Sequence, residues 1–396
     1  MKAVPHRIHK GLAESVSAVE NNMPVKPAAR ILGDGPARLW GMAPAERLRR
    51  SLVRAGLTDV AAWTGTAPAG PALLLRGDFV YDEVLVKDLA ASPATLLTDP
   101  LTGLVVAGHV AAEDVPALVE AIGKAPGDLA HRCRVVGPGE LSSTYNNALR
   151  KREAPYLLLL TPENAPDLEK RMFAGSYKGV TDLVTKHVWP LPARYVTKVC
   201  AVLGISPNMV TLASFLLVLA AFWLFLQGQF IPGLICAWGM TFLDTVDGKL
   251  ARVTLTSSKW GNVFDHGTDL IHPPFWWWAW VAGLSAVGME LEHPWLVLAI
   301  VLGGYVLQRV QEGMFIALFK IEMHIWRPFD SWFRLITARR NPNLLILTVA
   351  ALLGRPDVGM EAVAVWTLLC FLVHGWQIVQ AAAAKRHGPI ESWLKK

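Results

Sequence analysis

Long apolar segments in the second half of the chain limit what it can fold into more than any other feature. From Asn208 onward, apolar runs alternate with short charged loops. Because a helix needs about 20 mostly apolar residues to cross a bilayer, these runs predict a polytopic α-helical membrane domain with six transmembrane helices. The predicted spans are roughly 208–228, 230–249, 267–288, 294–318, 342–354 and 359–384, of which the fifth is the shortest.

The charges between the apolar runs predict how the helices are oriented. Lysine and arginine accumulate before the first run, after the second, after the fourth and in the tail, whereas Arg355 is the only strong cation in the other loops. Cytoplasmic loops of membrane proteins carry this excess of positive charge. We therefore expect a multi-pass protein of the cell inner membrane with cytoplasmic N- and C-termini. The segment "VTKHVWPLPARYVTKVCAVLG", before the first run, is typical of a helix lying in the interface.

The first part of the chain has a different composition. Up to about residue 175 it mixes charged and apolar residues as a soluble domain does, and its short apolar runs, such as "PALLLRGDFVYD", alternate with helical stretches. This alternation predicts a cytoplasmic α/β domain over 1–175, followed by the membrane domain over 176–396. The beginning of the chain has no apolar core of a signal peptide. No basic patch interleaved with aromatic residues suggests nucleic acid, and the four cysteines lack metal-type spacing.

Four aspartates lie where two predicted spans meet at the cytoplasmic side. Asp244 and Asp247 are three residues apart near the end of the second span, and Asp265 and Asp269 are four apart near the start of the third. Each pair shares one helical face at such spacing, and a short connection brings the two ends together. Ionisable groups at membrane depth are costly and usually functional.

Divalent cations would relieve the repulsion among four carboxylates. Mg²⁺ binds a few carboxylates together with substrate phosphates, and two ions can clamp a pyrophosphate. Gly248, Ala251 and Gly261 leave room for a substrate near the backbone, and nearby cations suit phosphate oxygens: Lys249, Arg252 and Lys259. We therefore expect two Mg²⁺ or Mn²⁺ ions at this place. Aspartates that merely cap helix ends and pair with these cations are the alternative.

The full spacing of these residues resembles a known signature. It reads Asp244-x2-Asp247-Gly248-x2-Ala251-Arg252-x8-Gly261-x3-Asp265-x3-Asp269 and is similar to that of the CDP-alcohol phosphotransferases, with every position filled. Six spans, and "SPNMVT" at Ser206–Thr211, add to the resemblance, which covers about residues 175–385. The second half of the motif, "TSSKWGNVFDHGTD", is similar to the branch that transfers phosphocholine or phosphoethanolamine to diacylglycerol.

The resemblance implies a reaction and a site. A CDP-alcohol donor and an alcohol acceptor, a lipid or a small alcohol, would give a phosphodiester and CMP, as in phospholipid biosynthesis. By the family pattern the four aspartates hold the metals, and Asp269 is also the general base. The CDP site would be bordered by Gly248, Ala251, Arg252, Gly261 and Lys259. Members of the family are often homodimers, so a homodimer among membrane lipids is expected.

Three further residues are candidates for substrate or acceptor contacts. His266 lies between two proposed ligands and is either a substrate contact or an ordinary hydrogen-bonding histidine. Arg309 and Glu312 lie in the fourth span, where polar groups seldom face lipid. They either line a cavity or pair with each other across one helical turn. "RRNPN", at 339–343, is interpreted as a positive anchor at the membrane surface, with a site for an anionic headgroup as the alternative.

The front domain resembles the sugar-phosphate nucleotidyltransferases, which are fused to this membrane family in some enzymes. Asp78 and Asp82 would then be metal ligands at the carboxyl edge of the sheet. The only candidate phosphate loop, "ARILGDGPARLWG", has few glycines and no strong strand before it. We therefore expect a degenerate domain with a structural or regulatory role. Two alternatives remain: a front domain that makes the CDP-alcohol for a phosphoinositol-type transferase, and a non-catalytic metal-binding membrane protein.

Overall fold

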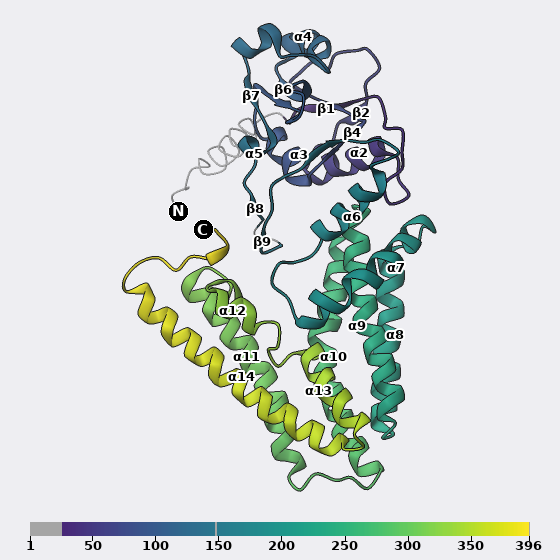
Figure 1. The fold of residues 1–396 in the computed structure, drawn as a ribbon, viewed down its shortest axis with the longest axis vertical. Coiled ribbons are helices and arrows are strands. Elements are labelled where there is room, and N and C mark those ends of the chain that lie inside the picture. Colours follow the sequence, from purple (N-terminus) through teal and green to yellow (C-terminus); the bar gives the residue numbers. More distant parts are fainter. Residues whose placement is uncertain (1–25, 147–148, 396) are drawn as a thin grey trace, which may run out of the picture. The chain divides into compact units, whose positions relative to one another are not determined.

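The computed structural model describes residues 26–146 and 149–395, and within them the backbone alone for Lys259, Trp260, Asn262, Asp265 and His266. The chain forms two compact units (Figure 1). The first contains residues 26–37, 43–142 and 155–161, and the second contains 38–42, 143–154 and 162–395. The observed division therefore falls before the boundary at residue 175 that composition suggested, and helix α6 (Ala165–Gly175) belongs to the second unit.

A six-stranded mixed sheet forms the centre of the first unit. Its strand order is β2-β1-β3-β6-β5-β7, and β6 runs antiparallel to both of its neighbours while the other pairs are parallel. A shorter antiparallel pair joins β4 to β10. The strands are β1 (Ala28–Leu32), β2 (Val60–Ala62), β3 (Ala72–Arg76), β4 (Phe79–Tyr81), β5 (Thr95–Thr98), β6 (Val105–Val110), β7 (Arg134–Val136) and β10 (Leu157–Leu159).

Helices cover both faces of this sheet because its strands are apolar on both sides. In β3, Leu73 and Leu75 pack into one hydrophobic cluster, and Ala72 and Leu74 pack into another. Alternate residues of a strand point to opposite faces, so β3 joins two cores, as expected for an α/β domain. The helical elements are α2 (Pro44–Arg54), α3 (Glu83–Ala90), η1 (Ala112–Asp114), α4 (Val115–Ala121), η2 (Gly127–His131) and α5 (Pro138–Leu141).

Strand β1 corrects one sequence expectation. No strong strand was expected before "GDGP", yet β1 ends at Leu32, directly before Gly33. Buried and half-buried residues alternate along β1. The strand forms because it pairs in parallel with β2 and β3, and this pairing cannot be recognised from its five residues alone. The α/β class predicted for this part of the chain is confirmed.

Long helices make up most of the second unit. They are α8 (Pro207–Leu226), α9 (Phe230–Val253), α10 (Lys259–Ala286), α11 (Pro294–Phe319), α13 (Arg340–Leu352) and α14 (Pro356–Lys385). Shorter elements precede, connect or follow them: β8 (Tyr145–Asn146), β9 (Lys151–Arg152), α6, η3 (Val184–Val188), α7 (Pro190–Val202), η4 (Met323–Ile325), α12 (Pro328–Phe333) and η5 (Trp393–Lys395). Helix α8 packs on α9 and α10, and α11 packs on α14.

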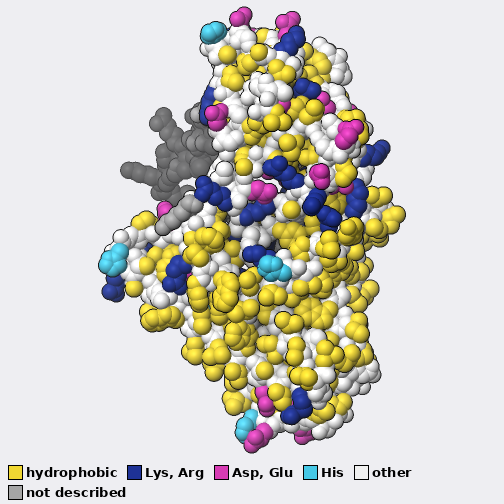
Figure 2. Space-filling view, in the orientation of Figure 1, with side chains coloured by type: hydrophobic (Ala, Val, Ile, Leu, Met, Phe, Trp, Pro, Cys, Tyr) yellow, Lys and Arg dark blue, Asp and Glu magenta, His cyan; other side chains and the backbone are white. Residues whose placement is uncertain are grey.

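The six long helices coincide with the six predicted spans, but only half of them satisfy a simple test for crossing a membrane. Among the described residues, α8, α11 and α14 are long and apolar enough. Helix α13 has 13 residues, fewer than the roughly 20 required, and α9 carries four charged side chains in its second half. Apolar side chains cover much of the surface that these helices show in Figure 2. A helical membrane domain is confirmed, whereas the count of six remains a prediction.

Sequence signals at the helix ends explain where the long helices begin. The Ser206 side chain accepts a hydrogen bond from the Met209 N–H, and Pro207 takes the first helical position of α8. Ser258 does the same for α10 by accepting from the Gly261 N–H at 2.9 Å. Such caps satisfy backbone donors that have no partner within the helix. The Ser258 cap fixes the start of α10, the helix that carries Asp265 and Asp269.

Buried tryptophans hold the centre of the helical unit together. Trp276 and Trp280, from the "PPFWWWAW" stretch of α10, are fully buried. Their indole N–H groups donate to the carbonyl oxygens of Val218 and Pro356, at 3.0 and 3.1 Å. A buried indole N–H requires such a partner. These two residues therefore join α10 to the backbone at α8 and at the start of α14.

Helices α8 and α10 approach each other so closely that a glycine is required. A β-carbon at Gly283 would lie 1.9 Å from the Phe225 carbonyl oxygen. We expect Gly283→Ala to destabilise the helical unit by about 3 kcal/mol, the upper range for overpacking, because backbone must move. Gly303→Ala in α11 is the control, since nothing lies within 4 Å of that position. Thermal unfolding in detergent should show a lower midpoint for the first variant only; equal midpoints would contradict the close packing.

Candidate active site

A cavity of about 410 Å³ lies within the second unit. Its walls come from α9, α10, α11, the start of α13 and the segment between α6 and α7. Three aspartates line it, Asp182, Asp244 and Asp269, whereas the basic residues are more numerous: Arg150, Lys178, Lys249, Arg252, Arg309, Arg334, Arg339 and Arg340. This excess of positive charge suits an anionic ligand.

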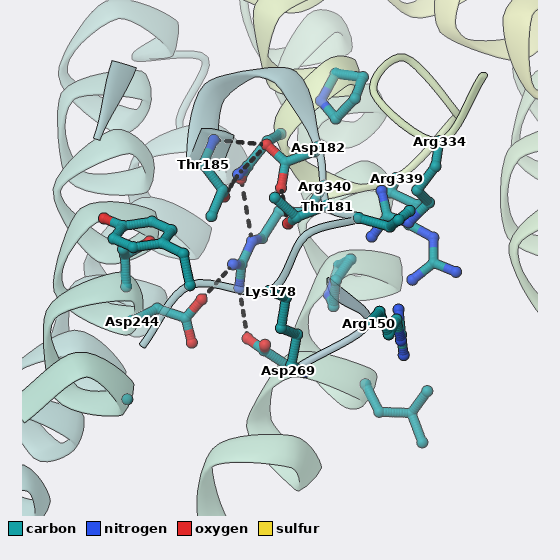
Figure 3. Close-up of a pocket in the computed structure, with 18 of the residues that line it drawn as sticks. Arg150, Lys178, Thr181, Asp182, Thr185, Asp244, Asp269, Arg334, Arg339 and Arg340 are labelled. Atoms are coloured by element: carbon teal, nitrogen blue, oxygen red, sulfur yellow. Dashed lines mark hydrogen bonds and ion pairs between the residues drawn. The ribbon is translucent and has the colours of Figure 1, made fainter. Parts of the chain in front are cut away.

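One arginine joins two of the predicted aspartates at this cavity (Figure 3). Arg340 donates through one terminal nitrogen to Asp244 and through the other to Asp269, each at 2.5 Å. Asp244 lies on α9, Asp269 on α10 and Arg340 at the start of α13. The carboxylates of two separate helices thus lie within the width of one guanidinium group.

Asp247 lies one helical turn from Asp244 and is almost completely buried. One of its carboxylate oxygens accepts from the Thr211 hydroxyl at 2.6 Å. The other is buried and has no hydrogen-bond partner. A buried carboxylate oxygen without a partner is costly, and a bound cation would remove that cost. The fourth predicted aspartate, Asp265, lies on α10, and its side chain is outside the described residues.

The donor set fits a hard divalent cation. Carboxylate oxygens from α9 and α10 meet beside the cavity, and these are the ligands that Mg²⁺ prefers. The positive guanidinium of Arg340 already lies between two of them. The described side chains alone contain no group of three or more His, Cys, Asp or Glu arranged to hold a metal. Two observations therefore support a divalent cation here: Asp244 and Asp269 lie close together, and one carboxylate oxygen of Asp247 has no hydrogen-bond partner.

The residues predicted around the nucleotide are placed unevenly. Gly248 and Arg252 line the cavity, and a β-carbon at Gly248 would lie 3.0 Å from a terminal nitrogen of Arg252. Gly261 lies in the first turn of α10, where a β-carbon would come within 2.8 Å of the Asn208 amide oxygen. Ala251 is half-buried on α9 and is not among the described lining residues. The side chains of Lys259 and His266 are outside the described residues.

Lys249 holds a chain segment in place. Its ammonium group donates to the Ser176 carbonyl oxygen at 3.1 Å and lies 3.4 Å from the centroid of the Tyr177 ring. A cation over an aromatic face is attracted by the ring. The lysine that sequence analysis assigned to phosphate oxygens therefore fixes the segment between α6 and α7 to helix α9, at the edge of the cavity.

Asp182 belongs to that same segment and was not predicted. Its carboxylate accepts from the Thr185 backbone N–H and from the Asn341 side chain, each at 3.0 Å. Burial alone would raise the pKa of Asp182, but these hydrogen bonds and the positive charge of Arg334 hold the pKa below its usual value. The carboxylate is therefore ionised at neutral pH. Asn341 comes from "RRNPN", so this stretch, interpreted as a membrane anchor, also builds the cavity.

Arg309 and Glu312 differ in position, although the sequence grouped them. Arg309 lines the cavity, whereas Glu312 is not among the described lining residues. Glu312 accepts from Arg309 at 3.2 Å and also from Arg339. Both interpretations offered for the pair thus describe part of the arrangement: one residue lines the cavity, and the two are ion-paired.

Several residues that line this cavity were not predicted from the sequence as site residues, among them Tyr177, Asp182, Arg334, Arg340 and Asn341. Arg334, Arg340 and Asn341 lie within or directly after the run of cations that follows the fourth apolar segment, whereas Tyr177 and Asp182 precede the first apolar segment and carry no such signal. Positive charge in such a loop is typical of any cytoplasmic connection. The sequence therefore did not distinguish cations that face lipid headgroups from cations that face a cavity.

Apolar long helices around a cavity lined by carboxylates and guanidinium groups define a class: a helical membrane protein with a basic cavity suited to an anionic ligand. Residues 204–339, about a third of the chain, match the model of the CDP-alcohol phosphatidyltransferase family. The family is generally dependent on divalent metals. The resemblance expected from the aspartate signature is confirmed, while the nucleotidyltransferase-like nature of the front domain remains a prediction.

Two curated relatives show the range of the family. An archaetidylinositol phosphate synthase of Pyrococcus horikoshii is 28% identical over 185 residues, which cover 46% of this chain and 87% of that protein. Cholinephosphotransferase 1 of Xenopus laevis is 31% identical over 137 residues, 31% of this chain and 33% of that protein. The chain thus spans most of the first relative and about a third of the second. The names of the two relatives refer to different alcohols, inositol phosphate and choline, so similarity alone does not identify the substrate of this chain.

Proposed function

We propose that this chain transfers a substituted phosphoryl group from a CDP-alcohol to the hydroxyl of an acceptor and releases CMP, as a step of phospholipid biosynthesis. The observation that carries the proposal is the convergence of Asp244 and Asp269, from two helices of the family's signature, at one basic cavity. A diphosphate is anionic, and a cavity with this excess of arginine and lysine favours its binding.

The chemistry is a displacement at phosphorus. The acceptor oxygen forms a bond to the phosphorus that carries the donor alcohol, and the bond from that phosphorus to the oxygen of the CMP phosphate breaks. Asp269 takes the proton of the acceptor hydroxyl as general base. Two divalent ions, Mg²⁺ or Mn²⁺, held by Asp244, Asp247, Asp265 and Asp269, would supply charge stabilisation to the diphosphate. Gly248, Ala251, Arg252, Gly261 and Lys259 border the CMP part of the donor.

The arginines on the far wall support an acceptor that carries an anionic group. Arg309, Arg334 and Arg339 line the side of the cavity made by α11 and the approach to α13, away from the α9 residues of the signature. Nε and one terminal nitrogen of Arg334 are buried without a hydrogen-bond partner among the described residues. Guanidinium groups of this kind are suited to phosphate. A phosphorylated polyol, as in the name of the Pyrococcus relative, fits this wall better than an uncharged diacylglycerol.

A substrate panel tests the function and the choice of acceptor together. The purified full chain in lipid nanodiscs would receive CDP-diacylglycerol or CDP-choline as donor, and inositol phosphate, inositol or diacylglycerol as acceptor, with Mg²⁺. We expect CMP release with CDP-diacylglycerol and inositol phosphate. Release only with CDP-choline and diacylglycerol would contradict the anionic acceptor. Divalent ion binding without CMP release from any pair would support a non-catalytic metal-binding protein instead.

We propose that the front domain is a degenerate nucleotidyltransferase-like domain that does not form a CDP-alcohol from CTP. The Asp34 carboxylate accepts from the Ala45 N–H at the first turn of α2, at 2.9 Å, where a phosphate loop would offer its backbone donors to the ligand. Asp78 is paired with Arg76 at 2.6 Å, and Asp82 caps α3 by accepting from the Val84 N–H. Each carboxylate thus has a local structural role. The full chain given CTP and a sugar phosphate should release no pyrophosphate, and release would support a bifunctional enzyme.

Membrane orientation completes the proposal. We propose six spans in the cell inner membrane, both termini in the cytoplasm, and a homodimer formed by the spans. The family match and the three apolar helices support a membrane location, and the loop cations support the orientation. Labelling of single cysteines at the two termini by a membrane-impermeant thiol reagent tests it. We expect labelling in inverted vesicles and none in intact cells.

A further inference from the structure

One carboxylate lies behind the arginine wall of the cavity. Glu312, on α11, accepts from Arg309 at 3.2 Å and from Arg339, and His324 lies 3.4 Å from the same oxygen that Arg339 contacts. The two guanidinium groups line the cavity, whereas Glu312 is not among its described lining residues. The three partners come from α11, η4 and the approach to α13, so Glu312 ties three parts of the chain together.

The arginines keep hydrogen-bonding capacity that Glu312 does not use. The Nε groups of Arg309 and Arg339 are buried without a hydrogen-bond partner, and so are Nε and one terminal nitrogen of Arg334. A guanidinium carries five N–H donors in a fixed plane. A carboxylate that binds one edge of this plane therefore also fixes the direction of the remaining donors.

The charges explain why this carboxylate is needed. Three guanidinium groups share this wall, and Glu312 is the carboxylate paired with two of them. Like charges this close repel one another, and partial burial strengthens the repulsion. Without a negative charge behind them, the arginines would turn away from one another. An ion-pair network that only supports the fold could lie anywhere in the protein. Here Arg309 and Arg339 line the cavity, whereas Glu312 is not among the described lining residues.

We propose that Glu312 is a positioning residue: it orients Arg309 and Arg339, whose side chains are 30% and 21% exposed, so that the exposed N–H groups of their guanidinium planes bind the anionic group of the acceptor. This assignment rests on the proposed function and deepens it. Glu312 touches no substrate and acts through the two arginines. It should therefore govern the binding of the acceptor and leave the binding of the CDP-alcohol, at α9 and the start of α10, unchanged.

Glu312→Gln is the main test, because the amide keeps the size of the carboxylate and removes its charge. CMP release by the full chain would be measured with CDP-diacylglycerol and inositol phosphate, and with inorganic phosphate as an inhibitor. We expect the KM for inositol phosphate and the inhibition constant of phosphate to rise about tenfold or more. We expect kcat to change less than about threefold and the KM for CDP-diacylglycerol to stay constant. A merely structural residue would alter both KM values or kcat alone.

A double-mutant cycle shows whether Glu312 acts through Arg339. Arg339→Gln should raise the KM for inositol phosphate, and adding Glu312→Gln to it should raise that KM by clearly less than it does in the wild-type chain. Fully additive effects would overturn the proposal. The control is Asp357→Asn, which makes the same chemical change in a carboxylate paired with Arg355 at 2.8 Å, where neither residue lines the cavity. It should leave all constants unchanged.

A second variant covers the case in which Glu312→Gln does not fold. Arg339→Lys keeps the positive charge opposite Glu312 but loses the planar group, so it should weaken inhibition by phosphate without changing the KM for CDP-diacylglycerol. A rise in the donor's KM instead would overturn the proposal. Failure of the proposed function is distinguishable: a wild-type chain that releases no CMP would remove both proposals, whereas an active wild type with unchanged constants in Glu312→Gln would remove this one alone.

Discussion

Asp269→Asn is expected to abolish CMP release, with turnover reduced by about a thousandfold or more, while the protein still accumulates and folds. The amide cannot accept the proton of the acceptor hydroxyl, and general-base catalysis alone contributes about 10²–10⁴ in rate. It also removes a charge from the proposed metal ligands. The fold should persist because the amide oxygen can still accept from Arg340, which also remains paired with Asp244.

The measurement is CMP release by purified wild type and variant at saturating substrates, together with thermal unfolding in the same nanodiscs. Asp357→Asn serves as the control again, because its carboxylate lies outside the cavity. Turnover of Asp269→Asn within tenfold of wild type would exclude its role as base. A loss of activity accompanied by a large fall in unfolding temperature would assign the effect to folding instead.

Removal of divalent metal is expected to have a comparably large effect. Treatment with EDTA should reduce CMP release to background, and Mg²⁺ or Mn²⁺ should restore it, because the diphosphate and the carboxylates cannot approach one another without bridging cations. Metal should also stabilise the folded state. At a concentration 100 times its dissociation constant, a ligand adds about 2.7 kcal/mol, which is readable as a higher unfolding temperature.

Asp244→Asn gives the matched variant for the metal experiment. This substitution removes one proposed ligand and should shrink the metal-induced rise in unfolding temperature, even where activity is already lost. The experiment also tests the arginine. Cations bound at Asp244 and Asp269 would compete with the guanidinium of Arg340 for the same oxygens. The apparent metal affinity of Arg340→Gln should therefore be higher than that of the wild-type chain. Activity that resists EDTA would contradict the metal-dependent mechanism.

The fold of the membrane half was largely predictable because its signals are local. Helix length follows from the number of consecutive apolar residues. The start of α10 at Lys259 was not predicted, since the third span was expected from about residue 267. The α/β domain was recognisable from strand β3, in which Ala72 to Leu75 are apolar and buried. Strand β1 was not recognised, since its order depends on parallel pairing with residues 60–62 and 72–76, and pairing between distant segments leaves no local pattern.

The candidate site divides in the same way. Spacing along two helices was enough to single out Asp244, Asp247 and Asp269, because residues three or four apart share a helical face. The role of Lys249 was not visible, since Tyr177, whose ring it contacts, is distant in the sequence. Glu312 was grouped with Arg309 because the two residues are three apart in the sequence. Its ion pair with Arg339 could not be predicted, because it depends on how the segment after η4 folds back toward α11.

The sequence by itself determined the membrane class, the α/β front domain and the spaced aspartates that mark the family, because apolar length and helical spacing are properties of consecutive residues. Only the tertiary structure decided that Arg334, Arg339 and Arg340 face one cavity rather than lipid headgroups. The physical reason is that a cation in a cytoplasmic loop has the same sequence signal in either environment. Its partner is chosen by the packing of helices far apart in the chain.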